Sequence, residues 1–424
     1  MTLTAPSTED FLIATKHCEL HALQQLLINC GLVTKVTELI HEVQRERGLS
    51  NTFIVSKGLR FGSQLNQEFV AATSAIDSFK NVLSTLDLNN CPSSSARLFS
   101  SLAFVLHCLD GLTTHRESVS EGNVDATENT RFYTRLIAGL LTVVFEAADI
   151  SSDPDITRAL VAMFNFVQGK EYAGQERAWG LIGFTSGTFS TAIQERLRAL
   201  QESQERCLTI FNDFTHTVAG ALWRQHEQSE ATEELGRLRK LIERYNEGNS
   251  LPTSISEVWY AVSTARIDQM QMVERELAKD LLERAAEKTC QAEEDLRLHH
   301  DNLKELANVE SPPSAPLSLL SDSSSDPTVK VTSGSSAAYA RSIFELVQSQ
   351  AKRLKKASDE LSEARQALEE RKLIDKAKGI LIQTHGIGEE EAYKQLRQSA
   401  MDNNKRIVDI AANIISVSVM LKPK

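Results

Sequence analysis

The sequence predicts an all-α protein, and three observations lead to this fold class. Apolar residues recur at spacings of three and four through almost all of the first 305 residues. Leu, Ala, Gln, Glu and Arg, which favour helices, dominate these stretches. The alternation of apolar and polar residues that is typical of half-buried strands is missing. Long helices joined by short turns imply one or two four-helix bundles.

The expected helices follow one another with short interruptions. The first and longest runs from about Glu9 to Ser56, where the turn residues of SKGLRFG end it. Asp153 followed by Pro154 predicts a helix start, because aspartate is a favoured N-cap and proline suits the first helical position. Further helices are expected at residues 64–87, 94–119, 129–148, 154–171, 174–184, 188–228, 231–247 and 253–308.

The chain divides into four expected segments. Residues 1–305 form the helical bundle, and residues 306–340 are a Ser- and Pro-rich linker without sustained periodicity. Residues 341–370 carry a short heptad stripe with a charged surface, which predicts a coiled coil. Residues 371–424 form a separate small helical module. The heptad stripe favours a homodimer, and the alternative is a lone amphipathic helix packed on its own domain.

Charge is distributed unevenly along the chain. The whole protein has 46 Lys and Arg against 57 Asp and Glu, a net charge of −11. From Arg341 to the end there are 16 basic and 12 acidic residues, a net of +4, which leaves 30 basic and 45 acidic residues, a net of −15, before it. This distribution argues against a protein that coats nucleic acid along its whole length, but it allows a local basic surface.

Several functional classes find no support in the sequence. The six cysteines include no C-x-x-C pair, so we expect reduced thiols and neither a disulfide framework nor a metal site. No secretory signal and no membrane-length apolar run occur, which predicts a cytoplasmic protein without membrane association. No catalytic triad, carboxylate pair or P-loop stands out. We therefore expect neither enzymatic activity nor a cofactor.

Three short helices are expected in the C-terminal module, at residues 372–383, 389–400 and 406–420, and Gly386 and Gly388 suit the turn that ends the first of them. The residues left outside the core are mainly basic or polar, which suits contacts with RNA phosphates. Tyr393 could stack on a base, although a position lining the core is an equal alternative. The expected core consists of Ile374, Ala377, Ile380, Leu381, Ala392, Leu396, Ala400, Ile407, Ile410, Ala411 and Ile414. The candidate RNA-binding residues are Lys376, Lys378, Tyr393, Arg397, Ser399 and Lys405, and the alternative for any single lysine is a solvated surface position.

The motif positions of this module resemble the ANTAR domain family. They include IDKAKGIL at 374–381, EAYKQLRQSA at 391–400, Asn404, and Ala411 with Ile414 and Ile415. Gly388 departs from the family pattern, in which a Ser or Thr helix cap is more usual. The resemblance implies binding to paired hairpins of nascent leader RNA, which prevents transcription termination and so affects the elongation complex indirectly.

Two Glu-Arg pairs stand among apolar residues, in QRERGLS at 44–50 and GQERAWG at 174–180. A shift of 130 positions lays Glu46 and Arg47 onto Glu176 and Arg177, which indicates a faint internal repeat. A buried arginine needs a partner, because an unpaired charge is costly to desolvate. A carboxylate such as Glu42, Glu46 or Glu176 could serve, and so could a bound anion.

The stretches QRERGLSNTFIVSKG, GQERA and VWYAVSTARIDQMQMVE (258–274) resemble the NIT domain, a helical nitrate- and nitrite-sensing family. Nitrate is a small planar monoanion, and a guanidinium offers two parallel donors in a matching plane. The resemblance therefore implies Arg47 and Arg177 as primary ligands, with Ser50 and Arg266 as further candidates.

NIT followed by ANTAR resembles a nitrate-responsive antiterminator of a nitrate assimilation operon. The expected function is a one-component regulator that binds leader RNA when nitrate or nitrite is present. The alternative from a different class is a helical scaffold that docks a protein partner, has a C-terminal dimerisation tail and senses no anion.

Overall fold

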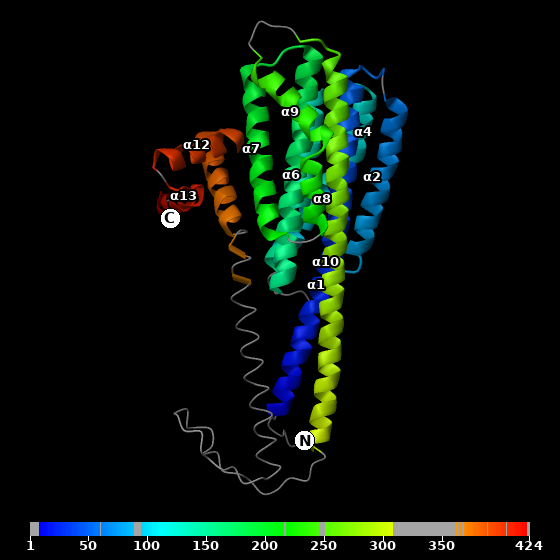
Figure 1. The fold of residues 1–424 in the computed structure, drawn as a ribbon, viewed down its shortest axis with the longest axis vertical. Coiled ribbons are helices and arrows are strands. Elements are labelled where there is room, and N and C mark those ends of the chain that lie inside the picture. Colours follow the sequence, from blue (N-terminus) through cyan, green and yellow to red (C-terminus); the bar gives the residue numbers. More distant parts are fainter. Residues whose placement is uncertain are drawn as a thin grey trace.

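The computed structural model confirms the all-α fold class, since every regular element in its described residues is a helix (Figure 1). Helix α10 (Ile255–Ala307) includes residues 306 and 307, whereas the rest of the predicted linker (306–340) and most of the predicted coiled coil (341–370) lie outside the described residues. The structure describes residues 8–59, 61–88, 95–151, 153–215, 218–245, 251–307, 361–362, 365–366, 369–387, 389–403 and 405–421.

Five helices form the first half of the N-terminal region. Helix α1 packs against α2 and α5, and α3 packs against α5. The single helix predicted at 94–119 is wrong, because Gly111 ends α3 and precedes α4. Glycine weakens a helix interior through its backbone freedom, and here it permits the break. The helices are α1 (Thr8–Val55), α2 (Gly62–Leu83), α3 (Ala96–Asp110), α4 (Leu112–Ser120) and α5 (Ala126–Asp149).

The second half repeats this plan with five more helices. Helix α6 packs against α7 and α10, and α8 and α9 also pack against α10. The two helices predicted at 154–171 and 174–184 are one continuous helix, and the helix predicted at 188–228 is two, because Thr215 takes an extended conformation. The helices are α6 (Pro154–Ser186), α7 (Thr191–Phe214), α8 (Val218–Glu227), α9 (Glu230–Glu243) and α10 (Ile255–Ala307).

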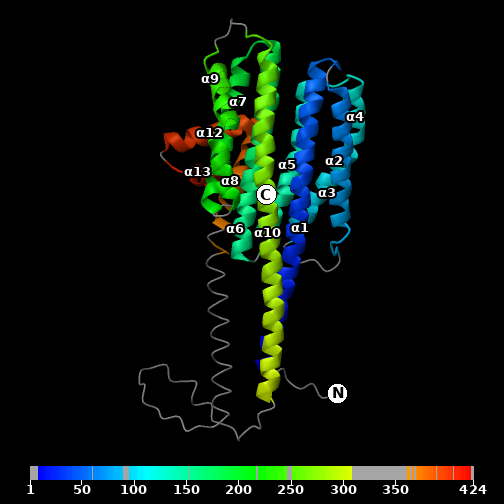
Figure 2. The same cartoon turned by 45° about the vertical axis from the view of Figure 1, so that its right-hand side comes forward.

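Contacts of α1 with α10 and of α5 with α6 join the two halves. In Figure 2, α2, α3 and α4 lie on one side and α7, α8 and α9 on the other, with α1 and α10 between them. One apolar core runs through both halves, from Leu26 of α1 to Trp223 of α8 and Leu281 of α10. None of the helices in the described residues is apolar over a length that would cross a membrane.

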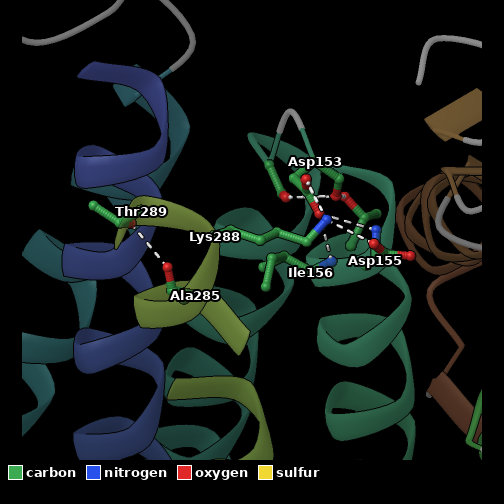
Figure 3. Close-up of polar contacts among 8 residues, drawn as sticks. Asp153, Asp155, Ile156, Ala285, Lys288 and Thr289 are labelled. Atoms are coloured by element: carbon green, nitrogen blue, oxygen red, sulfur yellow. Dashed lines mark hydrogen bonds and ion pairs between the residues drawn. The ribbon is translucent and has the colours of Figure 1, made fainter. Parts of the chain in front are cut away.

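The start of α6 is held by charged residues from two helices (Figure 3). Asp153 is the predicted N-cap, and its Oδ1 accepts the backbone N–H groups of Asp155 and Ile156 at 3.0 Å. Lys288 of α10 donates to Asp153 Oδ2 at 2.8 Å and to Asp155 Oδ2 at 2.6 Å. The lysine adds a tertiary contact to a local cap, so it ties α10 to the start of α6.

Asp153→Ala is expected to destabilise the protein more than Asp125→Ala. Asp125 caps α5 through the N–H groups of Thr127 and Glu128. Loss of such a cap costs about 1 kcal/mol, and Asp153→Ala removes in addition an acceptor of Lys288. Urea unfolding followed by circular dichroism measures both variants, and equal losses would show that the Lys288 contact adds no stability.

The C-terminal module consists of a helix over residues 369–385, α12 (Glu389–Asp402) and α13 (Ile407–Leu421). Its core contains all the predicted core residues except Ile380, which is half-buried outside the cluster. Gly386 has a φ of 65°, in the left-handed region that glycine favours. Its N–H donates to the carbonyl of Ile382 at 3.0 Å, which closes the first helix as predicted.

Candidate functional site

The structure brings the two predicted arginines together where α1 contacts α6. A methyl group on Gly48 of α1 would overlap Nη2 of Arg177, and one on Gly174 of α6 would overlap Nη2 of Arg47. Each guanidinium therefore lies directly against the glycine of the opposite helix. Both arginines are almost wholly buried, at 0% and 3% exposure.

Arg47 has a carboxylate partner within the protein. Its Nη1 donates to Glu171 Oε1 at 2.6 Å and its Nη2 donates to Oε2 at 3.0 Å, so the pair is bidentate. Nη1 also donates to the Thr134 hydroxyl at 3.2 Å. The protein-partner alternative thus holds for Arg47, but the partner is Glu171 of α6 and not one of the three carboxylates that the sequence suggested.

Arg177 has no such partner among the described residues. Its Nη1 donates to the Thr264 hydroxyl at 3.0 Å and its Nη2 donates to the backbone carbonyl of Gln44 at 3.2 Å. The Tyr260 ring lies 5.3 Å from the guanidinium carbon. Burial lowers the pKa of Arg177, and the charge of Arg47 acts in the same direction. Arg177 is therefore a buried cation with only neutral hydrogen-bond acceptors.

The surroundings of the two arginines repeat with the offset of 130. Thr134 and Thr264, which accept from Arg47 and Arg177, each lie 87 residues beyond their arginine. The preceding glutamates match too, since Glu46 binds Arg116 bidentately at 2.7 Å. Glu176 binds Arg239 in the same way, at 2.7 and 2.6 Å. The faint repeat in the sequence therefore corresponds to a repeated arrangement of side chains.

The two halves of the repeat differ at the position of the carboxylate that binds Arg47. Shifted by 130, Glu171 corresponds to position 41, where the chain has His41. Burial lowers the pKa of His41 far below its ordinary value, and the charge of Lys170 contributes. His41 is therefore neutral at neutral pH. The first half lacks the carboxylate that would complete a second arginine–glutamate pair.

The other two predicted ligands lie in the neighbouring clusters. Ser50 is fully buried beside Tyr133, whose hydroxyl donates to Glu46 at 2.6 Å. Arg266 donates to Gln204 at 2.8 Å, and burial lowers its pKa to about 10. Gln204 in turn donates to Glu176. The buried hydroxyl of Ser50 has no hydrogen-bond partner among the described residues.

Glu176 is the charged centre of the second of these clusters. Although burial acts in the opposite direction, the charge of Arg239 and its hydrogen bonds lower the pKa of Glu176. Gln201 and Gln204 donate to its two oxygens at 2.9 and 2.8 Å. Glu176 is therefore an ionised, fully engaged carboxylate that fixes the helix turn carrying Arg177.

The C-terminal module is docked on α7 through predicted RNA-binding residues. Arg397 of α12 forms an ion pair with Glu202 of α7. The guanidinium of Arg206 lies 4.4 Å from the centre of the Tyr393 ring, and Lys394 lies 3.8 Å from Glu195. The docked module thus contacts α7 through part of its basic and aromatic surface, although the side chains of Arg397 and Lys394 remain exposed.

A second set of contacts holds helix 369–385 near the site. Lys372 donates to Asp149 Oδ1 at 2.5 Å, and Arg371 donates to the Tyr172 hydroxyl at 3.4 Å. Tyr172 directly follows Glu171, the partner of Arg47. The anchoring point of the module and the arginine site therefore share one turn of α6.

The other candidate RNA-binding residues lie in different environments. Lys376 and Lys405 are exposed, whereas Ser399 is half-buried. Lys378 is largely buried and forms an ion pair with Asp375 at 2.8 Å. Tyr393 is half-buried outside the apolar core cluster of the module.

Sequence reasoning missed Glu171, His41, Thr134 and Tyr260. The repeat offset contained a signal for one of them, because Thr134 corresponds to Thr264, which lies two residues before the predicted site residue Arg266. Glu171 lies 124 residues from Arg47 and within an ordinary amphipathic stretch, so nothing local marks it.

Comparisons with known proteins confirm the two resemblances. A family model for nitrate and nitrite sensing (NIT) matches residues 38–282, and an ANTAR domain model matches residues 362–415. The chain is 29% identical over 416 residues to a nitrate regulatory protein of Klebsiella oxytoca, covering 98% of this chain and 96% of that protein.

A solved structure described as the NasR transcription antiterminator is also similar. It is 28% identical, has a TM-score of 0.60, and the match covers 98% of this chain and 100% of that chain. Since the NIT model spans more than half of the 424 residues, the chain belongs to the NIT family and carries an ANTAR domain near its C-terminus.

Proposed function

We propose that the chain is a one-component regulator that responds to nitrate or nitrite. In response it binds leader RNA hairpins through its ANTAR domain and prevents transcription termination of nitrate assimilation genes. The observation that carries the proposal is Arg177, a buried guanidinium without a carboxylate partner among the described residues, next to a second buried guanidinium. No enzymatic step is part of this function.

Arg47 and Arg177 are the primary ligands of the anion in this proposal. A guanidinium presents parallel N–H donors that suit the edge of a planar oxyanion. A bound monoanion would supply the charge that Arg177 lacks and would be recognised in a water-poor interior. Ser50 and Arg266 are further candidate ligands in this proposal: the buried hydroxyl of Ser50 has no hydrogen-bond partner among the described residues, and Arg266 also supports the Glu176 cluster through Gln204.

The docking of the ANTAR domain on α7 supports regulation by release of this domain. Glu202 neutralises Arg397, and Arg206 covers the ring of Tyr393, so α7 occupies residues expected to contact RNA. An anion that binds the undocked form more tightly shifts the equilibrium toward RNA binding. We propose the same four segments as the sequence analysis: a sensor bundle to residue 305, a linker to residue 340, a coiled coil to residue 370 and the RNA-binding module after it.

The expected RNA target determines the oligomeric state that we propose. Two hairpins require two copies of the ANTAR domain, so we propose a homodimer. Its effect on the transcription elongation complex is indirect, because it acts by preventing the terminator from forming in the RNA.

The scaffold alternative explains Arg177 poorly. Well-packed apolar residues often stabilise a buried position as well as or better than charged ones. A protein that only docks a partner therefore has no need for a buried guanidinium without a carboxylate partner. An anion sensor has a use for this group, because its hydrogen bonds go only to neutral acceptors and a bound anion would add a matching charge.

Leader-RNA binding by the full chain, with and without nitrate, tests the function. Sodium nitrate is compared with sodium chloride at equal ionic strength, because phosphate contacts make RNA affinity depend on salt. Nitrate is expected to strengthen binding at least about tenfold, which is a coupling free energy of about 1.4 kcal/mol. Arg397→Ala is expected to weaken binding in both salts. Equal binding in nitrate and chloride would contradict the proposal.

A further inference from the structure

We propose that Glu171 is a built-in counter-ion that an incoming anion displaces from Arg47. Glu171 therefore sets the anion concentration at which the protein responds. This inference rests on the proposed function and adds a regulatory residue to its site. It follows from the contacts of Glu171, from the chemistry of its carboxylate and from the difference between Glu171 and His41 at equivalent positions of the internal repeat.

The carboxylate of Glu171 has the same donor-binding edge as the proposed ligands. Carboxylate, nitrite and nitrate each offer two oxygens in a plane to a guanidinium fork. In the structure both oxygens of Glu171 are bound to the terminal nitrogens of Arg47, at 2.6 and 3.0 Å. An anion that takes this edge of Arg47 must replace Glu171 there.

Two glutamines hold Glu171 in this position. Gln44 of α1 donates to Oε2 at 2.9 Å, and Gln175, one turn later on α6, donates to Oε1 at 2.8 Å. Gln44 also accepts from Arg177 through its backbone carbonyl. Nitrate must displace Glu171 against the free energy of these hydrogen bonds. The hydrogen bonds therefore raise the anion concentration needed for binding.

The two halves of the repeat differ in whether the site arginine has a carboxylate beside it. Arg177 stands in the position equivalent to Arg47, but the residue equivalent to Glu171 is His41. The site therefore combines one arginine that is hydrogen-bonded to a carboxylate with one whose hydrogen bonds go to neutral groups, while the charges of Asp268 and Glu171 act on it without a hydrogen bond. With glutamates at both positions the site would be neutralised internally, and with none it would bind anions indiscriminately.

The position of Glu171 also connects the site to the ANTAR domain. The next residue, Tyr172, accepts a hydrogen bond from Arg371 of helix 369–385. Movement of the Glu171 side chain therefore occurs in the same turn of α6 that anchors the docked module.

Calorimetric titration of the full chain with sodium nitrate, at ionic strength held constant with sodium chloride, tests the inference. Glu171→Gln keeps the shape of the side chain and removes its charge, so the Kd for nitrate is expected to fall at least about tenfold. His41→Glu gives Arg177 its own carboxylate, and the Kd is expected to rise by a similar factor.

Two further variants separate displacement from a general effect of charge. Gln175→Met removes one donor to Glu171 without changing any charge, so displacement predicts a Kd several-fold lower, on the order of threefold. Glu274→Gln removes an equally buried carboxylate that is paired with Lys170 and with neither site arginine. Its Kd is expected to remain within about twofold of the unmodified chain, which is about 0.4 kcal/mol.

The outcomes distinguish the two proposals. If the unmodified chain binds nitrate and Glu171→Gln binds it equally or more weakly, the counter-ion role is wrong while the sensor function stands. If Glu171→Gln tightens binding but Gln175→Met does not, Glu171 acts only by its charge and is not displaced. If neither the unmodified chain nor Glu171→Gln binds nitrate, the proposed function itself fails. Thermal melts of each variant establish that it is folded, and Gln175→Met retains all buried charges should Glu171→Gln fail to fold.

Discussion

Replacing Arg47 by methionine is expected to lower the free energy of unfolding by about 3–5 kcal/mol, because it leaves Glu171 buried without its cation. The same replacement at Arg177 is expected to cost about 1 kcal/mol or less. Arg177 makes hydrogen bonds only to neutral groups, so removing it also removes an uncompensated desolvation penalty. Both variants are expected to lose nitrate-dependent RNA binding, since each removes a proposed ligand.

Urea denaturation and RNA binding measured on the same preparations test this difference. Arg45→Met is a matched control from the same helix, because Arg45 is partly exposed and pairs with Glu68. It is expected to leave the response to nitrate intact. Equal destabilisation by Arg47→Met and Arg177→Met would show that Arg177 has a charge partner that its contacts do not reveal.

Glu202→Lys is expected to give RNA binding without nitrate. The substitution turns the ion pair with Arg397 into a repulsion while leaving every residue of the ANTAR domain unchanged. Exposed ion pairs contribute about 0–1 kcal/mol, and a reversal adds repulsion to that loss. We therefore expect a shift of about 1–2 kcal/mol, which raises the undocked fraction about tenfold when docking dominates.

Glu205→Lys is the control for this prediction. Glu205 lies one turn further along α7 and is exposed, so the change in net charge is identical. Gel shifts of leader RNA with the full chain in chloride measure both variants. If Glu202→Lys and Glu205→Lys bind RNA equally, the effect comes from net charge, and the Arg397 contact does not restrain the domain.

The sequence was sufficient for the parts of the fold that local patterns determine. The cap at Asp153, the glycine turn at Gly386 and the core of the C-terminal module all depend on residues close together in the chain. Helix ends were less predictable where glycine was involved. Two helices were predicted at 154–171 and 174–184, but α6 continues through this stretch, where Gly174 lies against the guanidinium of Arg47.

The candidate site was predictable only in part, because some of its contacts depend on tertiary packing. Arg47 and Arg177 were predicted as anion ligands from a repeated Glu-Arg pair and a family resemblance. The structure places both where α1 contacts α6. Glu171 could not be identified, because its role depends on the contact between α1 and α6 and its neighbours in sequence are unremarkable. Partners across a helix interface are determined by tertiary packing, which periodicity does not report.

The difference between His41 and Glu171 at equivalent positions of the repeat has a consequence for how such a protein can be assembled. A symmetric homodimer of one half would place the same residue at both equivalent positions, since a twofold axis copies every side chain. It could have two glutamates or two histidines, but never one of each. Only when both halves share one polypeptide can His41 and Glu171 differ, so covalent fusion of the halves is what permits two chemically equivalent arginines to have unequal tasks.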